Sequence, residues 1–300
     1  MTNVSVNHHL VSKGYQKNFA TSNQKLTVLN ALSGVVIEPL RPTIRNLVAE
    51  HWNTYMDDDG KMNTDVETAY GRIEGSVMRR IREINFRNCD QKHHEAIVHL
   101  FAIHLVRSRS YNLFYESVRD SVLPRFVSEI VEDPRTDELF QAENGRSAVV
   151  GELRSIVTTH VDRMFRNKRD SVQSAVTTSG AIVGRLRGLH IQVIELDSSL
   201  PGFVLGDVPI VHANLEQKRF GFRDRLAIDD ADLIMGPLSR RVLVCFTPDR
   251  VQSKLLRSKK KSQEINALLL HACDREVSCH PDDQLSVSRL CRQPHALRRP

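Results

Sequence analysis

The stretch that decides the fold is residues 90–109, DQKHHEAIVHLFAIHLVRSR. Asp90 is a typical helix N-cap, because its side chain can accept a backbone N–H of the first turn. The residues behind it leave almost no polar face: Ile97, Leu100, Phe101, Ile103 and Leu105. A helix that is apolar nearly all round is usually buried. The sequence therefore predicts a central helix that carries Arg107 near its end.

Amphipathic helices are predicted on both sides of this stretch. Before it, apolar residues recur every three or four positions at Val66, Ala69, Ile73, Val77, Ile81 and Ile84. Thr64 and Glu67 have the spacing of a capping box, in which each side chain satisfies a backbone donor of the other. After it, a similar stripe runs through Val150, Leu153, Val157, Val161 and Phe165. Both periods predict helices with one buried face.

Strand patterns occupy the two ends of the chain. Residues 25–30 are β-prone, residues 31–34 have turn chemistry, and residues 35–37 are β-branched, which predicts a hairpin. From Leu189 onward the pattern is again typical of strands, until a last helix at about 262–273. This order predicts an α+β fold: an N-terminal β-hairpin, a helical middle, and a C-terminal, mainly antiparallel sheet closed by a helix. We expect the hairpin to join that sheet.

The composition of the chain limits the class of protein to which it can belong. The chain has 300 residues and a formal net charge of +6, and no apolar run approaches the ~20 residues of a membrane span. The N-terminus has no secretory pattern, so we expect a cytoplasmic protein. The five cysteines are scattered and odd in number, which argues against a disulfide framework. We expect a single domain over residues 1–281 and a basic, flexible tail over residues 282–300, where the chain is polar and Arg-rich.

The basic charge favours anionic partners through long-range attraction. Much of the excess comes from residues 257–261 and the last three residues, however. Runs of this kind are more often solvated surface than binding sites. Charge alone therefore does not predict nucleic-acid binding, although an anionic ligand or a nucleic acid stays a candidate partner. The sequence gives no oligomeric state.

Five short motifs follow one another along the chain: Asn7-His8-His9-Leu10-Val11 with Tyr15 and Asn18-Phe19-Ala20, the helix His94 to Arg109, Gly206-Asp207-Val208-Pro209, Gly236-Pro237-Leu238-Ser239, and Asn266 followed by Arg275. In this order they resemble the bacterial family known as domain of unknown function 4238. The resemblance covers residues 6–277. The chain departs from the family pattern at His104, where glutamine is usual, at Gly206, where serine is usual, and at Val11-Ser12 and Lys17. The resemblance implies a fold and a residue list but no reaction.

His8 and His9 are candidates for proton transfer, because histidine titrates near neutral pH. In an extended segment, adjacent side chains point to opposite faces, so only one of the two can enter a given pocket. The alternative is a surface histidine without a role.

His104 and Arg107 are three residues apart on the predicted central helix and share a face. An arginine on so apolar a helix needs an anion, because an unpaired buried charge is costly. It could clamp a phosphate or carboxylate of a substrate. It could equally form an internal ion pair, with Asp207 as the first choice and Glu74 as the second. Asp207 sits where a strand ends at a proline turn, a position that suits either a site or a turn.

Metal and nucleotide cofactors are not expected. His94-Glu95 and His99 miss the H-E-x-x-H spacing by one residue, and the cysteines lack paired C-x-x-C spacing. The chain also has no phosphate-binding glycine loop.

Two hypotheses about function remain open. The first is an enzyme that acts on a phosphate-bearing substrate, a nucleotide or nucleic acid. Its catalytic groups would be His8, His9 and Asp207, and its substrate-binding groups Arg107, His104 and Glu74. The second is a non-catalytic interaction or structural protein whose polar cluster only stabilises the core.

Overall fold

Helix α3 (Gln91–Val106) lies at the centre of the protein, as its sequence predicts. It begins with a capping box: Asp90 accepts the His93 N–H at 3.0 Å, and His93 Nδ1 accepts the Asp90 N–H at 3.2 Å. Eleven of its 16 residues are buried. The computed structural model describes residues 7–50, 54–56, 59, 61–165 and 168–293. No helix within these ranges is long and apolar enough to cross a membrane.

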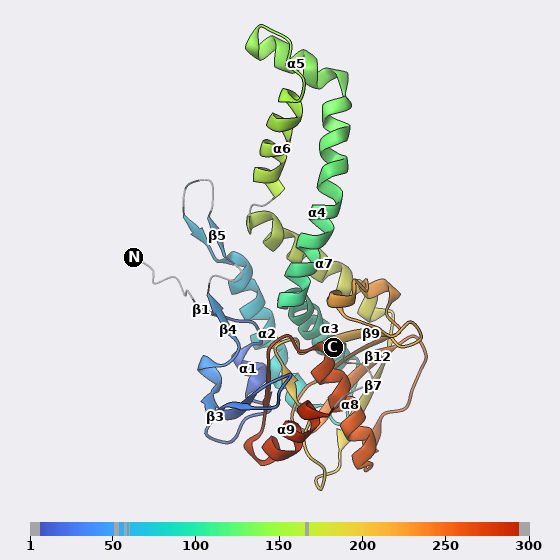
Figure 1. The fold of residues 1–300 in the computed structure, drawn as a ribbon. Helices are drawn as coiled ribbons and strands as arrows, with labels where there is room; N and C mark the ends of the chain where they lie inside the picture. The colour runs from blue at the N-terminus through green and yellow to red at the C-terminus, as the bar shows by residue number, and fades with distance from the viewer. Residues whose placement is uncertain (1–6, 51–53, 57–58, 60, 166–167, 294–300) are drawn as a thin grey trace.

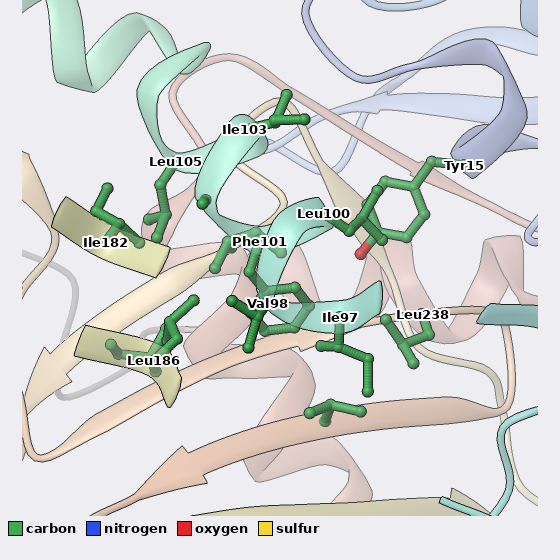
Figure 2. Packing of buried hydrophobic residues seen from close by; sticks show 14 of the residues in the cluster. Tyr15, Ile97, Val98, Leu100, Phe101, Ile103, Leu105, Ile182, Leu186 and Leu238 are labelled. Carbon is green, nitrogen blue, oxygen red and sulfur yellow. The ribbon is translucent and has the colours of Figure 1, made fainter. Parts of the chain in front are cut away.

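Helix α3 packs between α2 (Asp65–Glu83) and α7 (Lys168–Arg187). Figure 2 shows its apolar side chains directed at neighbours on all sides, with Tyr15, Ile182 and Leu186 among them. Phe101 meets the sheet through an edge-to-face contact with Phe246, with ring centroids 5.5 Å apart. A Cβ at Gly236 would lie 3.1 Å from the Phe101 ring, so glycine is what permits this close approach.

The largest sheet has six strands in the order β10-β9-β11-β12-β7-β13. They are β10 (Arg219–Phe220), β9 (Val211–Asn214), β11 (Leu233–Pro237), β12 (Val242–Thr247), β7 (His190–Leu196) and β13 (Lys254–Leu256). Every neighbouring pair is antiparallel except β13 with β7. The predicted α+β fold, with its helical middle and antiparallel C-terminal sheet, is confirmed (Figure 1).

The predicted hairpin forms from β2 (Lys25–Asn30) and β3 (Val36–Pro42). It pairs with C-terminal strands in a second sheet of order β3-β2-β14-β8, with β14 (Glu276–Cys279) and β8 (Leu205–Gly206). The hairpin therefore joins C-terminal strands, but not those of the six-stranded sheet. The short elements near the N-terminus are β1 (Asn7–His9), α1 (Lys13–Gln16), the 3-10 turn Thr43–Arg45, β4 (Val48–Glu50), β5 (Tyr55–Met56) and β6 (Met62–Asn63).

Three helices form an arm that stands away from the rest of the protein (Figure 1). They are α4 (Arg109–Glu132), α5 (Pro134–Asn144) and α6 (Glu152–Phe165). Helices α4 and α6 pack side by side. Helix α6 corresponds to the stripe of apolar residues predicted from Val150 onward. We name α4, α5 and α6 the helical arm.

The chain beyond residue 282 is not a loose tail, at least as far as residue 293. After α8 (Lys259–Ala272) and β14, a 3-10 turn (Pro281–Asp283) leads into α9 (Gln284–Arg292). Helix α9 buries Val287, Leu290 and Cys291 in a second hydrophobic cluster with α8 and β14. The prediction of a flexible tail from residue 282 is wrong for this helix, because three buried apolar residues among nine are enough for one buried face. Residues 294–300 lie outside the described residues.

Candidate functional site

Arg107 follows directly after α3, and only 2% of its surface is exposed. Its Nη1 donates to Glu74 Oε1 at 2.8 Å. Its Nη2 donates to Glu67 Oε1 at 2.8 Å and to the His9 carbonyl at 2.6 Å. The prediction that Arg107 is buried against an acidic partner is confirmed, and Glu74 is one of its two carboxylate partners.

Helix α2 places both carboxylates on the same face, because Glu67 and Glu74 are seven residues, or two turns, apart. The sequence pattern had assigned Glu67 to a capping box with Thr64. In the structure Thr64 is the N-cap residue but makes no side-chain cap hydrogen bond. That prediction is wrong because the Glu67 carboxylate lies instead against the buried Arg107, where a charge-assisted hydrogen bond is stronger than a cap.

A cavity of about 400 Å³ opens beside this ion-pair cluster. It is lined by His9, Ser12, Lys13 and Gly14, by Glu67, Gly71, Glu74, Gly75 and Met78 of α2, and by Arg107. A Cβ on Gly71 or Gly75 would meet nothing within 4 Å, so neither glycine is required by packing. Each costs the helix about 1 kcal/mol relative to alanine. The volume lies within the range of small-molecule sites, roughly 300–1,000 Å³. We name this space the α2 cavity.

Burial gives Glu74 an unusual proton affinity. Burial, together with the neighbouring Glu67, raises the pKa of the Glu74 carboxyl to about 7, although Arg107 opposes the shift. The carboxyl therefore carries its proton part of the time at neutral pH. A group with a pKa near the working pH is well placed to exchange protons with a ligand.

His9 has the opposite tendency. Burial lowers the pKa of its imidazole, and the positive charges of Arg107 and Lys13 also lower it. Hydrogen bonds to the backbone of Ile44 and Thr43 act in the opposite direction and raise it. The ring is therefore neutral at neutral pH and can accept a proton. Because both cations act on this one imidazole, the α2 cavity has two positive charges near His9.

His104 lies behind the cavity and does not line it. Its ring is fully buried and stacks on Tyr15, with centroids 5.0 Å apart. Its Nε2 is 3.7 Å from Glu74 Oε1. Burial lowers the pKa of His104 to about 3, with help from Arg107, so the ring is neutral.

Of the adjacent histidines, His9 lines the α2 cavity and His8 does not. The His8 ring is buried, with Nδ1 3.9 Å from Glu67 Oε2. This is the arrangement predicted for neighbouring residues of a strand. His8 therefore contacts the cluster from outside the cavity.

Asp207 serves a different part of the fold. Its carboxylate oxygens accept the backbone N–H groups of Asp274 at 2.8 Å, Arg275 at 2.7 Å and Glu276 at 3.2 Å. The predicted ion pair between Asp207 and Arg107 is wrong, because these three donors hold Asp207 at the start of β14. Burial raises the pKa of Asp207, and the three N–H groups oppose that shift.

Other motif residues also tie distant segments together. The Tyr15 hydroxyl donates to the Pro237 carbonyl, and Asn18 Nδ2 donates to the Leu238 carbonyl at 3.0 Å. Asn266 accepts the Val204 N–H at 3.1 Å and donates to the Gly202 carbonyl at 3.0 Å. These side chains hold loops to strands and do not line the α2 cavity.

Seven residues that line the cavity are absent from the predicted site: Ser12, Lys13, Gly14, Glu67, Gly71, Gly75 and Met78. One signal was present, since Glu67, Gly71 and Glu74 share a helix face at spacings of four and three. A carboxylate–glycine–carboxylate face interrupts the apolar stripe, and it needs a partner cation. Within the described ranges, no group of three or more His, Cys, Asp or Glu side chains could hold a metal ion.

A model of the family described as Protein of unknown function (DUF4238) matches residues 7–283 of the chain, nearly its full length. No curated protein and no solved structure matches it.

Proposed function

The chain belongs to the DUF4238 family, and we propose that it is an intracellular enzyme that acts by acid–base catalysis on a phosphate-bearing substrate in the α2 cavity. One observation carries the proposal: Glu74, whose carboxyl has a pKa of about 7, and His9, whose imidazole is neutral, both line the same open cavity. Perturbed titratable groups in a cavity are a physical signature of active sites. All five cysteines are free thiols, which supports a reducing compartment.

Phosphoester hydrolysis fits these two groups. Water would attack phosphorus and lose a proton to the neutral His9 imidazole. The bond from phosphorus to the leaving oxygen would break, and that oxygen would take the proton of Glu74. His9 then starts neutral, and Glu74 starts with its proton in part of the molecules at neutral pH.

Two cations, which line the cavity together with Glu67 and Glu74, support a substrate with phosphate. Arg107 and Lys13 both lie close enough to His9 to lower its pKa. Both Nη atoms of Arg107 already donate to protein oxygens, so we assign the direct contact with a phosphate oxygen to Lys13. Arg107 would act through its charge and by holding Glu74. A nucleotide or a nucleic acid end is the substrate class that this arrangement favours.

A second candidate is a non-catalytic protein in which the same cluster only stabilises the fold. The three hydrogen bonds of Arg107 favour it, because they join β1, α2 and α3 through His9, Glu67 and Glu74. The hydrogen bonds of Asp207 and Tyr15 likewise join separate segments of the fold.

Substitution of Glu74 by glutamine separates the two. Glu74→Gln keeps an oxygen for Arg107 but removes the titrating proton. We expect at least a hundredfold loss of hydrolysis of diphenyl phosphate or phenyl phosphate, whose leaving oxygen is basic enough to need a proton, in line with the 10²–10⁴-fold typical of a general acid. His9→Ala should lose a similar factor.

The control is Glu83→Gln on the same helix, which does not line the cavity and should keep full activity. Circular dichroism should show all variants folded. The enzyme proposal fails if the parent hydrolyses neither ester nor a panel of nucleotides and oligonucleotides. It also fails if Glu74→Gln keeps the parent's rate.

A further inference from the structure

A second cavity, of about 540 Å³, lies between the base of the helical arm and the rest of the protein. Helices α4 and α7 line it, together with residues of the 3-10 turns Phe222–Asp224 and Ile228–Asp230. It shares no lining residue with the α2 cavity. Its lining also differs in polarity, because aromatic and aliphatic side chains form most of its wall. We name it the arm cavity.

Four aromatic rings contribute to the wall of the arm cavity: Tyr111, Phe114, Tyr115 and Phe222. The Phe222 ring stacks on Phe114, with centroids 5.3 Å apart and planes 29° apart. It also meets Tyr111 edge to face at 5.3 Å. Rings that support one another in this way present flat, fixed faces. Such faces favour a planar aromatic ligand through offset stacking and edge contacts.

Helix α7 supplies the polar part of the wall. The Tyr111 hydroxyl donates to Thr178 Oγ1 at 2.9 Å and lies 3.3 Å from Ser174 Oγ. These bonds join α4 to α7 across the cavity. They fix the Tyr111 ring, and they make the cavity a feature of the folded state that exists before a ligand binds.

Arg185 is the cation of the arm cavity. Its Nε is buried and has no hydrogen-bond partner among the described residues. Its carboxylate neighbour, Asp229, is 3.9 Å away and has a side chain that is 88% exposed, so the pair is weak. Its other protein contact is a long one, from Nη2 to the Asp229 carbonyl at 3.4 Å.

Arg187, two residues further along the same helix, shows the contrast. Its Nε lies 3.2 Å from both carboxylate oxygens of Glu95. Arg187 is therefore fully matched by a carboxylate, and Arg185 is not. A guanidinium binds a carboxylate best through two parallel hydrogen bonds, and Arg185 has the capacity to do so.

We propose that the arm cavity binds a planar aromatic molecule with one anionic group, its ring against Phe222 and Tyr111 and its anion on Arg185. A carboxylate is the group that the planar fork of Arg185 matches. The volume suits a ligand of two fused rings, since sites of roughly 300–1,000 Å³ hold drug-sized molecules. This site is separate from the proposed acid–base site and does not depend on it.

Calorimetry with three probes tests the charge requirement. The probes are 2-naphthoate, 2-naphthamide and 2-naphthyl phosphate, which share a ring system and differ in the attached group. We expect 2-naphthoate to bind the parent at least about tenfold more tightly than the uncharged amide. The reason is that only the carboxylate can accept two charge-assisted hydrogen bonds from the Arg185 guanidinium. Tighter binding of the phosphate than of the carboxylate would overturn the assignment of a carboxylate ligand.

Two variants assign the binding to this cavity. Arg185→Gln should remove the preference for 2-naphthoate over the amide, and the matched control Arg187→Gln should keep it. Ala181→Trp places a large side chain in the cavity from an exposed position of α7 and should abolish binding of both probes. Thermal melting should show that all three variants fold.

A preference that survives Arg185→Gln, or binding that survives Ala181→Trp, would overturn the proposal. Glu74→Gln should leave 2-naphthoate affinity unchanged. If it abolishes that affinity, the probe occupies the α2 cavity and the arm cavity is not its site.

Discussion

Helices α3 and α4 follow one another with only two residues between them, yet they occupy opposite environments. Eleven residues of α3 are buried, whereas α4, with 24 residues, buries Ser110, Tyr111 and Val127. In Figure 1 the first lies within the body and the second extends out of it. Burial, more than length or hydrogen bonding, is therefore what distinguishes the region that specifies the fold from the region attached to it.

The same contrast appears in two arginine–glutamate pairs. Arg107 and Glu74 in the body, and Arg125 and Glu129 on α4, are both joined by hydrogen bonds of 2.8 Å. The arginine side chains are 2% and 84% exposed. Water screens the second pair and competes for its donors, so an identical distance has a very different energetic consequence.

The largest expected effect is the loss of Arg107. Arg107→Ala leaves Glu67 and Glu74 without their cation, and breaking such a buried pair costs roughly 3–5 kcal/mol. Urea unfolding measures the change. The matched variant Arg125→Ala should change the unfolding free energy by less than about 1 kcal/mol. Similar losses in both variants would show that burial does not separate the two pairs.

Inorganic phosphate and nucleotides add a second readout to the Arg107 experiment. If the α2 cavity binds phosphate, either ligand should raise the melting temperature of the parent. Arg107→Ala should lose that rise. An Arg107→Ala protein with the stability and the ligand response of the parent would show that the buried ion pairs of Arg107 serve neither the fold nor ligand binding.

A smaller effect is expected in the pH dependence of stability. The pKa of Glu74 is raised from 4.5 to about 7 in the folded protein, so the folded state binds more protons than the unfolded state between these values. Stability from this group is therefore lost as pH rises from about 4.5 to 7, by roughly 3 kcal/mol at most. Glutamine at this position does not titrate.

The measurement is the difference in unfolding free energy between Glu74→Gln and the parent. We expect this difference to shift in favour of the variant between pH 5 and pH 8. His104 does not titrate in this range, because burial lowers its pKa to about 3. A difference that stays constant with pH would show that Glu74 has an ordinary pKa, and a shift in the opposite direction would show a depressed one.

The smallest effect is expected at the end of the arm. Leu139 on α5 is 66% exposed, so Leu139→Ala should change the unfolding free energy by less than about 0.5 kcal/mol. Thermal melting is sufficient to test this. A loss above 1 kcal/mol, or one that depends on protein concentration, would mean that the apolar surface of the arm is covered in solution.

Much of the body could be predicted from local patterns. The Asp90 cap, the apolar helix behind it and the hairpin at residues 25–37 are each encoded within about 20 residues, and each forms as predicted. The burial of Arg107 followed from the apolar residues around it. These successes share one cause, since each depends on a neighbour in the sequence.

The parts that could not be predicted depend on distant partners. Glu67 has the spacing of a cap residue, and its true partner lies 40 positions away. Asp207 was expected to face Arg107, but it meets backbone donors 67 to 69 positions later. The role of Gly71 and Gly75 is visible only once the N-terminal segment lies opposite them. Spacing along a chain carries no information on such pairs.

The hydrogen bond from Tyr15 to the Pro237 carbonyl links residues 222 positions apart. A ribosome therefore releases the segment that contains His9 and Lys13 long before its anchor exists. Until Pro237 emerges, this segment is held through β4 and Arg107 but lacks its tie to β11. Synthesis is slow relative to local folding, so this tie forms after the other contacts of the cavity wall. The complete wall is thus an indicator of a nearly finished chain: a nascent fragment that stops before β11 presents the wall without this anchor.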